Sequence, residues 1–477
     1  MTYSISRAEQ ALQAAHGALN LRWYPRCHLA ARAGWMNDPN GLVWFDGAYH
    51  AFYQHHPFSA QWGPMHWGHA RSKDLVHWEH LTVALAPQGP EDKDGCFSGS
   101  AVVDGDTLAL IYTGHCFHGE TGDEDNLYQV QCLATSRDGV HFERRGTIVD
   151  TPPGIHHFRD PKVWREGKHW YMVVGARVGD TGQVRLFRSP DLRQWHEEGV
   201  LDQAEAGMGF MWECPDFFML GGKRVLMFSP QGLAALGFAN RNLFQCGYLV
   251  GDWKPGGAFV REGEFTELDH GHDFYAAQSF LTPDGRRIVI GWLAMWESPM
   301  PEQQDGWAGQ LSLPRELSLG EGNRLQMRPA NEVEALRQAW TPWPARTLKN
   351  QQAGLLENAH ALEVVLRWEC ANSTAEQYGL SLGDGLRIYV DAQLQRLVLA
   401  RHYPQHGLSG TRSIPLAAGA PLSLRLFIDS SSVEVFVNDG EACLSSRIYP
   451  DSDGRALSLF AWSGEATLSE AGAWQLE

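Results

Sequence analysis

The sequence lacks an excess of positive charge, a long apolar run and a dense set of cysteines. Its 39 Lys and Arg residues are outnumbered by 56 Asp and Glu residues, which gives a formal net charge of −17. This balance argues against nucleic acids and anionic membranes as partners. No run of 18 apolar residues occurs, so the sequence predicts no membrane span.

The eight cysteines are too sparse for a disulfide scaffold, and none forms a C-x-x-C pair. We therefore expect reduced thiols. The first 20 residues, MTYSISRAEQALQAAHGALN, contain no apolar core of signal-peptide length, although their apolar residues fall at helical spacing. We interpret residues 1–24 as a helical extension of a soluble, cytoplasmic protein.

Strand–turn–strand patterns recur along the chain at a long and regular period. Five of them start at residues 42, 101, 162, 216 and 279, as in LVWFDGAYHAFYQ (42–54) and AVVDGDTLALIYTG (101–114). A second hairpin-like element follows in several units, as in ARSKDLVHWEHL (70–81). Four strands every 50–60 residues are typical of propeller blades, and an antiparallel sandwich would not explain so long a period. We predict a five-bladed β-propeller over residues 25–335.

The sequence pattern changes near residue 330. The chain of 477 residues also exceeds what one hydrophobic core usually holds. The segment 329–340 has a helical pattern, and we interpret 336–354 as a linker. Strand patterns then continue to the C-terminus, which predicts a β-sandwich over residues 355–477. The predicted fold class is all-β, a five-bladed propeller followed by a sandwich.

Acidic residues precede the first strand of three of the five repeats. Asp38 lies in WMNDPNG, Asp160 in FRDP and Glu213 in MWECPD. Because the first strand of each blade lines the central channel, we expect these carboxyl groups to meet at one mouth. Aromatic side chains are expected to wall this mouth: Trp35, Trp62, Phe97, Trp212, Tyr275 and Trp292.

Three carboxyl groups in an aromatic pocket are typical of sugar chemistry. Breaking a glycosidic bond needs one acid to protonate the leaving oxygen and one carboxylate to attack the anomeric carbon or activate water. Carboxylates that lie close together cannot all ionise freely, so one should keep its proton. Glu213, flanked by Trp212 and Cys214, suits this role, whereas Arg159 should keep the carboxylates near it ionised.

Each motif also has a simpler interpretation. NDPNG alone is a turn, RDP is a short tripeptide, and Glu213 alone could be a salt-bridged edge residue. Their joint placement in a five-fold repeat favours function. Histidine pairs could suggest a metal, but they lack acidic partners at ligand spacing, so we predict no metal and no organic cofactor. We interpret Cys214 as a neighbour of Glu213 rather than a nucleophile.

The motifs WMNDPNG, FYQHHP, QWGPMHWGHARSKDLVHW, FSGSAV, FRDPKVW, MWECPDFF and GHDFYAAQ together resemble glycoside hydrolase family 32, the β-fructofuranosidase or invertase family, and within it the intracellular bacterial sucrose hydrolases. The resemblance implies that Asp38 is the nucleophile, Glu213 the general acid/base and Asp160 the transition-state stabiliser. It also implies that the fructose subsite is lined by Asn37, Gln54, Trp62, Phe97, Ser98, Arg159, Tyr275 and Trp292. Ala277 departs from the pattern, since such enzymes often have Pro there.

The resemblance implies hydrolysis of sucrose to glucose and fructose with retention at the fructosyl carbon, and the expected partner is a small sugar. We expect a monomer or homodimer, since a sandwich packed beside a propeller offers surface for a dimer. Three alternatives stay open. One is an inverting five-bladed glycosidase such as an arabinanase. Another is a sugar-binding propeller without catalysis. The third is a hydrolase of sucrose 6-phosphate, against which the acidity of the chain argues mildly.

Overall fold

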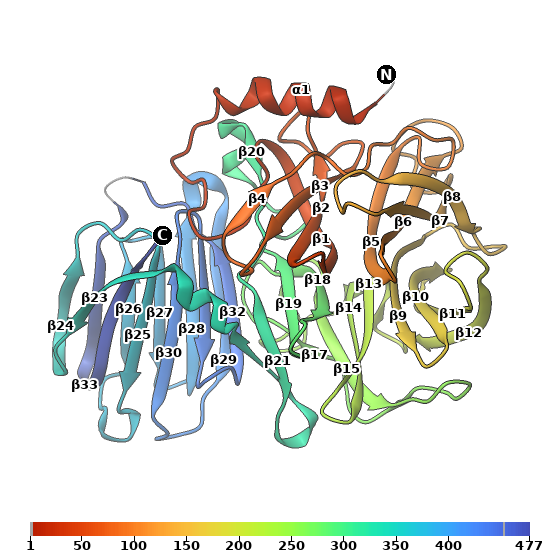
Figure 1. The fold of residues 1–477 in the computed structure, drawn as a ribbon. Coiled ribbons are helices and arrows are strands. Elements are labelled where there is room, and N and C mark those ends of the chain that lie inside the picture. The colour runs from red at the N-terminus through yellow and green to blue at the C-terminus, as the bar shows by residue number, and fades with distance from the viewer. Residues whose placement is uncertain (1–2, 452–453) are drawn as a thin grey trace.

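The computed structural model describes residues 3–451 and 454–477. Its strands form two parts that lie side by side, a propeller on the right of Figure 1 and a sandwich on the left. The predicted fold class is therefore confirmed. One helix, α1 (Ile5–His16), precedes the propeller; the Ser4 side chain caps its first turn, and Ala8 and Leu12 are its buried residues. Among the described residues, no helix has the length and apolarity needed to cross a membrane.

The five blades follow one another along the chain as antiparallel sheets. Blade 1 contains β1 (Gly34–Phe45), β2 (Ala48–His56), β3 (His66–Ser72) and β4 (Trp78–His80). Blade 2 contains β5 (Gly95–Asp104), β6 (Thr107–Phe117), β7 (Leu127–Ser136) and β8 (Glu143–Val149). Blade 3 contains β9 (Phe158–Glu166), β10 (His169–Val178), β11 (Thr181–Ser189) and β12 (His196–Gln203). Blade 4 contains β13 (Met208–Leu220), β14 (Lys223–Leu233), β15 (Gly247–Asp252), β16 (Val260–Arg261) and β17 (Thr266–Glu267). Blade 5 contains β18 (Tyr275–Leu281), β19 (Arg287–Trp292), β21 (Arg315–Leu319) and β22 (Leu325–Pro329).

Apolar side chains fill the space between neighbouring blades, because each sheet carries apolar residues on both faces. Trp67 of blade 1 and Tyr112 of blade 2 share one such core, and Met36 and Phe280 share the core between blades 1 and 5. The short strand β20 (Trp307–Ala308) leaves blade 5 and pairs in parallel with the start of β1, which closes the ring. The innermost strand of blade 1 is therefore paired on both sides, by β2 and by β20.

A bulge interrupts the pairing of the innermost strand in every blade, near the point where the predicted acidic residues lie. In blades 1, 3, 4 and 5 two residues of this strand oppose one on the partner, and in blade 2 the register shifts between Phe97 and Gly99. Asp160, Cys214 and Ala276 adopt positive φ within these bulges. A bulge bends its strand and re-aims its side chains, so the chain turns selected residues toward the channel.

The C-terminal part is a sandwich whose two layers share one long strand. The strand order is β29-β28-β27-β26-β33-β25-β30-β31-β32, and β33 (Leu457–Leu476) pairs with β26 (Gln377–Leu382) through its first half and with β25 (Leu362–Trp368) through its second. The remaining strands are β27 (Leu386–Asp391), β28 (Arg396–Tyr403), β29 (Leu408–Pro415), β30 (Leu422–Ile428), β31 (Ser432–Val437) and β32 (Ala442–Arg447).

The expected linker is wrong. Most of residues 336–354 lies in β23 (Arg337–Trp343) and β24 (Arg346–Leu356), both of which pair with β33 and so belong to the sandwich. The helical pattern at 329–340 corresponds to a single 3₁₀ segment, η3 (Asn331–Leu336), before β23 begins. Most side chains of β23 are exposed, so the strand has no buried alternation that a sequence pattern could reveal.

Candidate active site

Asp38 lies in the bulge of β1 and is held by two neutral donors. Ser98 of blade 2 donates from Oγ to its Oδ2 at 2.5 Å, and the Asn37 amide donates to its Oδ1 at 3.0 Å. The indole N–H of Trp35 in turn donates to the Asn37 Oδ1 at 2.7 Å, which fixes the amide. Asp38 is 9% exposed. The carboxylate is therefore oriented, yet no Lys, Arg or His side chain within residues 3–451 and 454–477 forms an ion pair with it.

Asp160 occupies the equivalent bulge of β9 with φ of +69°. Its backbone N–H donates to the Thr113 hydroxyl, and its Oδ2 accepts the backbone N–H of Cys214 at 2.9 Å. The Cys214 Sγ lies 3.6 Å from Oδ2 of Asp160 and 3.6 Å from Oδ2 of Asp38. One sulfur thus contacts carboxylates from blades 1 and 3, although they are far apart in sequence.

Glu213 precedes Cys214 and completes what we call the carboxylate cluster, namely Asp38, Asp160 and Glu213. Arg159 donates from Nε and Nη2 to the Glu213 Oε1 at 3.0 and 2.8 Å. The Tyr275 hydroxyl donates to Oε2 at 2.5 Å, and the Gln231 amide donates to the same oxygen at 2.9 Å. Both carboxylate oxygens are therefore held by side chains from three blades.

The arrangement differs from the predicted one in two ways. Asp38 is the second of the two bulged residues of β1, and Asp160 is the first of the two in β9; each is followed by Pro. Glu213 instead pairs with Ser229 directly before the bulge of β13, as Arg159 pairs with Gly175 in blade 3. Arg159 was expected beside Asp160 and instead pairs with Glu213 of the next blade. Contrary to the sequence prediction, Glu213 is therefore ion-paired rather than merely desolvated by its neighbours.

Burial and mutual repulsion act on the two aspartates. Burial and the charge of Glu213 raise the pKa of Asp38 to about 6, against the opposing hydrogen bonds from Ser98 and Asn37. Burial and the charge of Glu213 likewise raise the pKa of Asp160 well above its usual range, although Arg159 opposes the shift. Burial and Glu213 also raise the pKa of Tyr275, which keeps its hydroxyl a donor. The ligand-free cluster thus retains a proton near neutral pH mainly through its aspartates.

The predicted aromatic wall is partly present. Trp62 is 44% exposed and meets Phe97 edge to face at 6.2 Å, and Phe97 stacks on His115 at 4.1 Å. Trp35 belongs to the same apolar cluster as Tyr275 and Cys214. Of these rings, only Trp62 and the partly exposed Phe97 present surface at the mouth, since Trp35 and His115 are buried.

Two of the expected wall residues have other roles in the structure. The ring of Trp212 points away from Glu213 into the core between blades 3 and 4, where it stacks on Phe228 at 4.1 Å, so its assignment to the wall is wrong. Strand alternation explains this, since neighbouring side chains face opposite sides of a sheet. Trp292 is fully buried against Trp35 and Trp296 and presents no exposed ring face. Gln54 donates to the Cys96 carbonyl and so ties blade 1 to blade 2.

Three side chains that no motif indicated support the cluster. Gln231 contacts Glu213 directly. Arg159 Nη1 donates to the Gln129 Oε1 at 3.3 Å and to the His157 Nδ1 at 3.0 Å, which holds the guanidinium against Glu213. Burial and Arg159 lower the pKa of His157 to about 4, so its ring is a neutral acceptor. Gln129 and Gln231 lie on second or third strands of their blades, where single polar residues carry no recognisable sequence signal.

Side chains that could ligate a metal occur throughout residues 3–451 and 454–477. No group of three or more His, Cys, Asp or Glu side chains lies there in an arrangement that could hold a metal ion.

Comparison with known proteins identifies both parts of the chain. The model of the "Glycosyl hydrolases family 32 N-terminal domain" matches residues 28–329, and that of the "Glycosyl hydrolases family 32 C terminal" matches residues 332–475. The chain is 57% identical to a sucrose-6-phosphate hydrolase and 54% identical to a raffinose invertase, both from Escherichia coli and both matched over 100% of each chain. Among solved structures, a family 32 β-fructofuranosidase from Bombyx mori is 37% identical with a TM-score of 0.88, covering 99% of this chain and 98% of that one. A mutant of the Bombyx mori protein has been solved in complex with sucrose.

Proposed function

Because the chain belongs to glycosyl hydrolase family 32, we propose that it hydrolyses sucrose to glucose and fructose by a retaining double displacement at the fructosyl anomeric carbon. The observation that carries the proposal is the carboxylate cluster itself. Three acidic side chains from three blades are drawn around the Cys214 sulfur and backbone at one end of the channel. Two carboxyl groups beside one bound sugar are what a retaining glycosidase requires.

In the first step Asp38 attacks C2 of the fructosyl ring while Glu213 protonates the glucosyl oxygen. The C2–O bond to glucose breaks, an ester bond to Asp38 forms, and glucose leaves. Ser98 and Asn37 keep the Asp38 carboxylate aimed, which reduces the entropy lost on reaching the reactive geometry. Glu213 must be protonated at this stage. The proton that the ligand-free cluster retains on its aspartates is the one that Glu213 then carries.

In the second step water attacks C2 of the ester. Glu213, now a carboxylate, accepts a proton from that water, fructose is released and Asp38 is regenerated. Arg159 suits this step because its guanidinium stabilises a negative Glu213 at 2.8 Å. Asp160, fixed through the Cys214 N–H, is proposed to bind fructose hydroxyls and to stabilise positive charge on the ring in the transition state.

The remaining substrate contacts follow from the wall. We assign Asn37, Ser98, Arg159 and Tyr275 to the fructosyl side, since all four touch the cluster. Trp62 and Phe97 are assigned to the mouth, where an exposed ring can stack on a sugar. Gln54 and Trp292 are assigned a supporting role: Gln54 donates to the Cys96 carbonyl next to Phe97, and Trp292 packs against Trp35.

The stereochemistry tests the mechanism. Proton NMR of the first-formed fructose should show the anomer that retains the configuration of sucrose, before mutarotation. First formation of the opposite anomer would assign an inverting mechanism and would refute the ester with Asp38.

Sucrose 6-phosphate is the second candidate substrate, favoured by the name of the 57% identical relative. The ratio of kcat/KM for sucrose and sucrose 6-phosphate decides between them. We expect a higher value for sucrose, because the net charge of −17 disfavours an anionic substrate. A preference of tenfold or more for the phosphate would reverse the assignment.

We also propose a cytoplasmic protein that acts as a monomer or homodimer. The mostly buried cysteines, all present as free thiols in the structure, suit a reducing compartment. Analytical ultracentrifugation of the purified chain determines the oligomeric state, and fractionation of expressing cells determines the location.

A further inference from the structure

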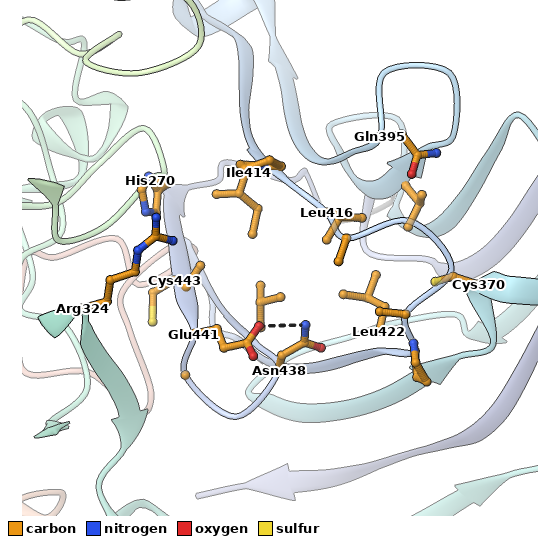
Figure 2. A pocket seen from close by; sticks show the side chains of 18 of the residues that line it. His270, Arg324, Cys370, Gln395, Ile414, Leu416, Leu422, Asn438, Glu441 and Cys443 are labelled. Carbon is orange, nitrogen blue, oxygen red and sulfur yellow. Dashed lines mark hydrogen bonds between the residues drawn. The ribbon is translucent and has the colours of Figure 1, made fainter. Parts of the chain in front are cut away.

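A second cavity lies where the propeller meets one end of the sandwich, and it shares no residue with the carboxylate cluster. Its volume is about 470 Å³, within the range of small-molecule sites. The propeller contributes residues from β15, β17 and β22, and the sandwich contributes residues from its core and from β31 and β32. Figure 2 shows side chains from both parts around it.

The interior of this cavity is apolar and is lined by side chains that belong to two packed cores. Buried aliphatic residues from the propeller and the sandwich face it: Leu268, Leu325, Met327, Val390, Ile414, Leu422 and Val437. The loop 417–421, with the sequence AAGAP, borders the cavity and is exposed. Because the side chains of this loop are small and stand at the exposed edge of the cavity, we expect a bulky residue there to obstruct a ligand that enters.

Most polar groups at the wall are already engaged by the protein. The Tyr248 hydroxyl accepts the Leu325 N–H at 3.0 Å, and the Asn438 amide donates to Glu441 at 3.1 Å. Glu267 accepts the Asn240 N–H at 2.9 Å and lies 3.3 Å from the His270 ring nitrogen. A ligand would therefore gain few hydrogen bonds here, and its body must be apolar.

Arg324 is the charged group of the lining whose side chain is not engaged by the protein. It is exposed at the rim, and within the part of the chain that the structure describes no carboxylate forms an ion pair with it. Figure 2 places Arg324 on the same side of the cavity as His270. Glu267 and Glu441 also line the cavity and accept hydrogen bonds from Asn240, His270 and Asn438. Among the residues that the structure describes, Arg324 is the arginine of the lining, and no protein group engages its guanidinium, so it is the cation that can pair with an anion.

We propose that this cavity binds an amphipathic monoanion, a small molecule with an aliphatic body and one carboxylate. The body fills the apolar interior, and the carboxylate pairs with Arg324 at the rim. Because the ligand contacts both the propeller and the sandwich, its binding stabilises the folded chain. The proposal does not depend on the substrate or mechanism assigned above.

Isothermal titration of the full chain with octanoate, below its micelle concentration, tests the proposal. We expect saturable one-to-one binding, accompanied by a rise in the melting temperature. Octanoate and 1-octanol share the aliphatic body, so the difference in their dissociation constants reports the contribution of the carboxylate. Absence of saturable octanoate binding to the wild-type chain overturns the proposal.

Two variants localise the binding. Ala420→Trp obstructs the entrance and should abolish octanoate binding, and Arg324→Gln should weaken it at least tenfold while leaving 1-octanol binding unchanged. Arg193→Gln removes an exposed arginine of blade 3 and should bind octanoate like the wild type. Unchanged octanoate affinity in Ala420→Trp would place the ligand elsewhere, and unchanged affinity in Arg324→Gln would exclude the ion pair. All variants should keep wild-type kcat for sucrose, which verifies folding, and Arg324→Gln serves alone if Ala420→Trp fails to fold.

Discussion

At the scale of single residues, the burial of Asp38 at the reaction site lowers the stability of the folded protein. Its raised pKa of about 6 means that the folded state disfavours the carboxylate that the reaction needs. Relative to an unfolded pKa near 3.9, a shift of about two units corresponds to roughly 3 kcal/mol. This cost is absent below the unfolded pKa and is complete above the folded one.

Asp38→Asn should therefore abolish turnover and stabilise the protein. We expect kcat to fall at least a thousandfold, and the melting temperature to exceed that of the wild type by a margin that grows as pH rises from 4 to 7. Differential scanning fluorimetry at several pH values measures the margin. Asp150→Asn, at an exposed site, should show no such trend. A variant that is less stable than the wild type at pH 7 would contradict the repulsion described here.

The same pKa predicts the acid limb of activity. Protonated Asp38 cannot attack C2, so kcat/KM for sucrose should fall as pH drops through about 6. Initial rates between pH 4 and 8 give the profile of the free enzyme. A plateau that extends unchanged down to pH 4 would be incompatible with Asp38 as the nucleophile.

His157 should act as a positioning residue through Arg159. His157→Phe removes the acceptor of Arg159 Nη1, so the guanidinium is held less firmly against Glu213. We expect kcat to fall about tenfold and the alkaline limb of the pH profile to move, with little change in melting temperature. The neighbouring His156 is exposed, and His156→Phe is the matched control. If the pH profile of His157→Phe matches that of the wild type, His157 serves only in packing.

The sequence was informative about single residues where a motif and a repeat coincided. Asp38, Asp160 and Glu213 could be predicted as neighbours because each stands at the start of an innermost strand. The pairing of Arg159 with Glu213 could not be predicted, since it depends on Glu213 standing directly before its bulge, whereas Asp160 stands within its own. The inward direction assigned to Trp212 was wrong because adjacent side chains of a strand face opposite sides of the sheet, and Glu213 already faces inward.

At the scale of elements, the strand that carries Glu213 is positioned by close contact with blade 3. A Cβ atom on Gly175 of β10 would lie 2.1 Å from the Trp212 carbonyl oxygen, which belongs to backbone and cannot yield easily. Gly182 of β11 makes room for the Trp212 ring in the same way. Small residues in blade 3 thus set the position of β13.

Gly175→Ala should displace β13 and with it Glu213. We expect a loss of kcat of tenfold or more together with a lower melting temperature, measured by sucrose hydrolysis and calorimetry. Gly354→Ala, where the added methyl meets no atom within 4 Å, should be neutral in both assays. Wild-type activity in Gly175→Ala would show that the spacing of blades 3 and 4 does not fix the acid.

At the scale of elements, the sequence predicts strands where hairpins repeat, but not where a strand is defined only by its pairing with a distant strand. The propeller was predictable because its hairpins repeat with turn residues at fixed places and buried residues between them. Strands β23 and β24 were mistaken for a linker because most of their side chains face solvent. They are strands because they pair with β33, and such long-range pairing leaves little trace in local sequence.

At the scale of the whole molecule, a buried ionic network joins the propeller to the sandwich. His28 contacts Asp429 and Glu434 at 2.7 Å each, and Arg315 contacts Glu434 at 2.5 Å and Asp269 at 2.9 Å. These side chains are fully or almost fully buried. Removing one partner of such a network leaves an uncompensated charge, which typically costs about 3–5 kcal/mol.

His28 makes this junction sensitive to alkali. Burial alone would lower the pKa of His28, but its hydrogen bonds to Asp429 and Glu434 raise it to about 9. The stabilisation is thus fully present below the unfolded pKa near 6.5 and is lost as pH rises through about 9. The melting temperature of His28→Gln should fall less between pH 7 and 10 than that of the wild type. His77→Gln, at an exposed ion pair, should keep the wild-type slope, and an equal slope in His28→Gln would rule out the network as the cause.

The central claim is that Asp38 forms a covalent bond to fructose, while Glu213 donates a proton to the glucosyl oxygen and later accepts one from water. It is tested most directly by treating Glu213→Gln with a fructosyl fluoride, whose leaving group needs no proton, and analysing the peptides by mass spectrometry. The account predicts that one fructosyl group accumulates on the peptide that contains Asp38, because the water that releases it lacks its base. Label on another residue, or turnover of the fluoride without any covalent adduct, would contradict the account.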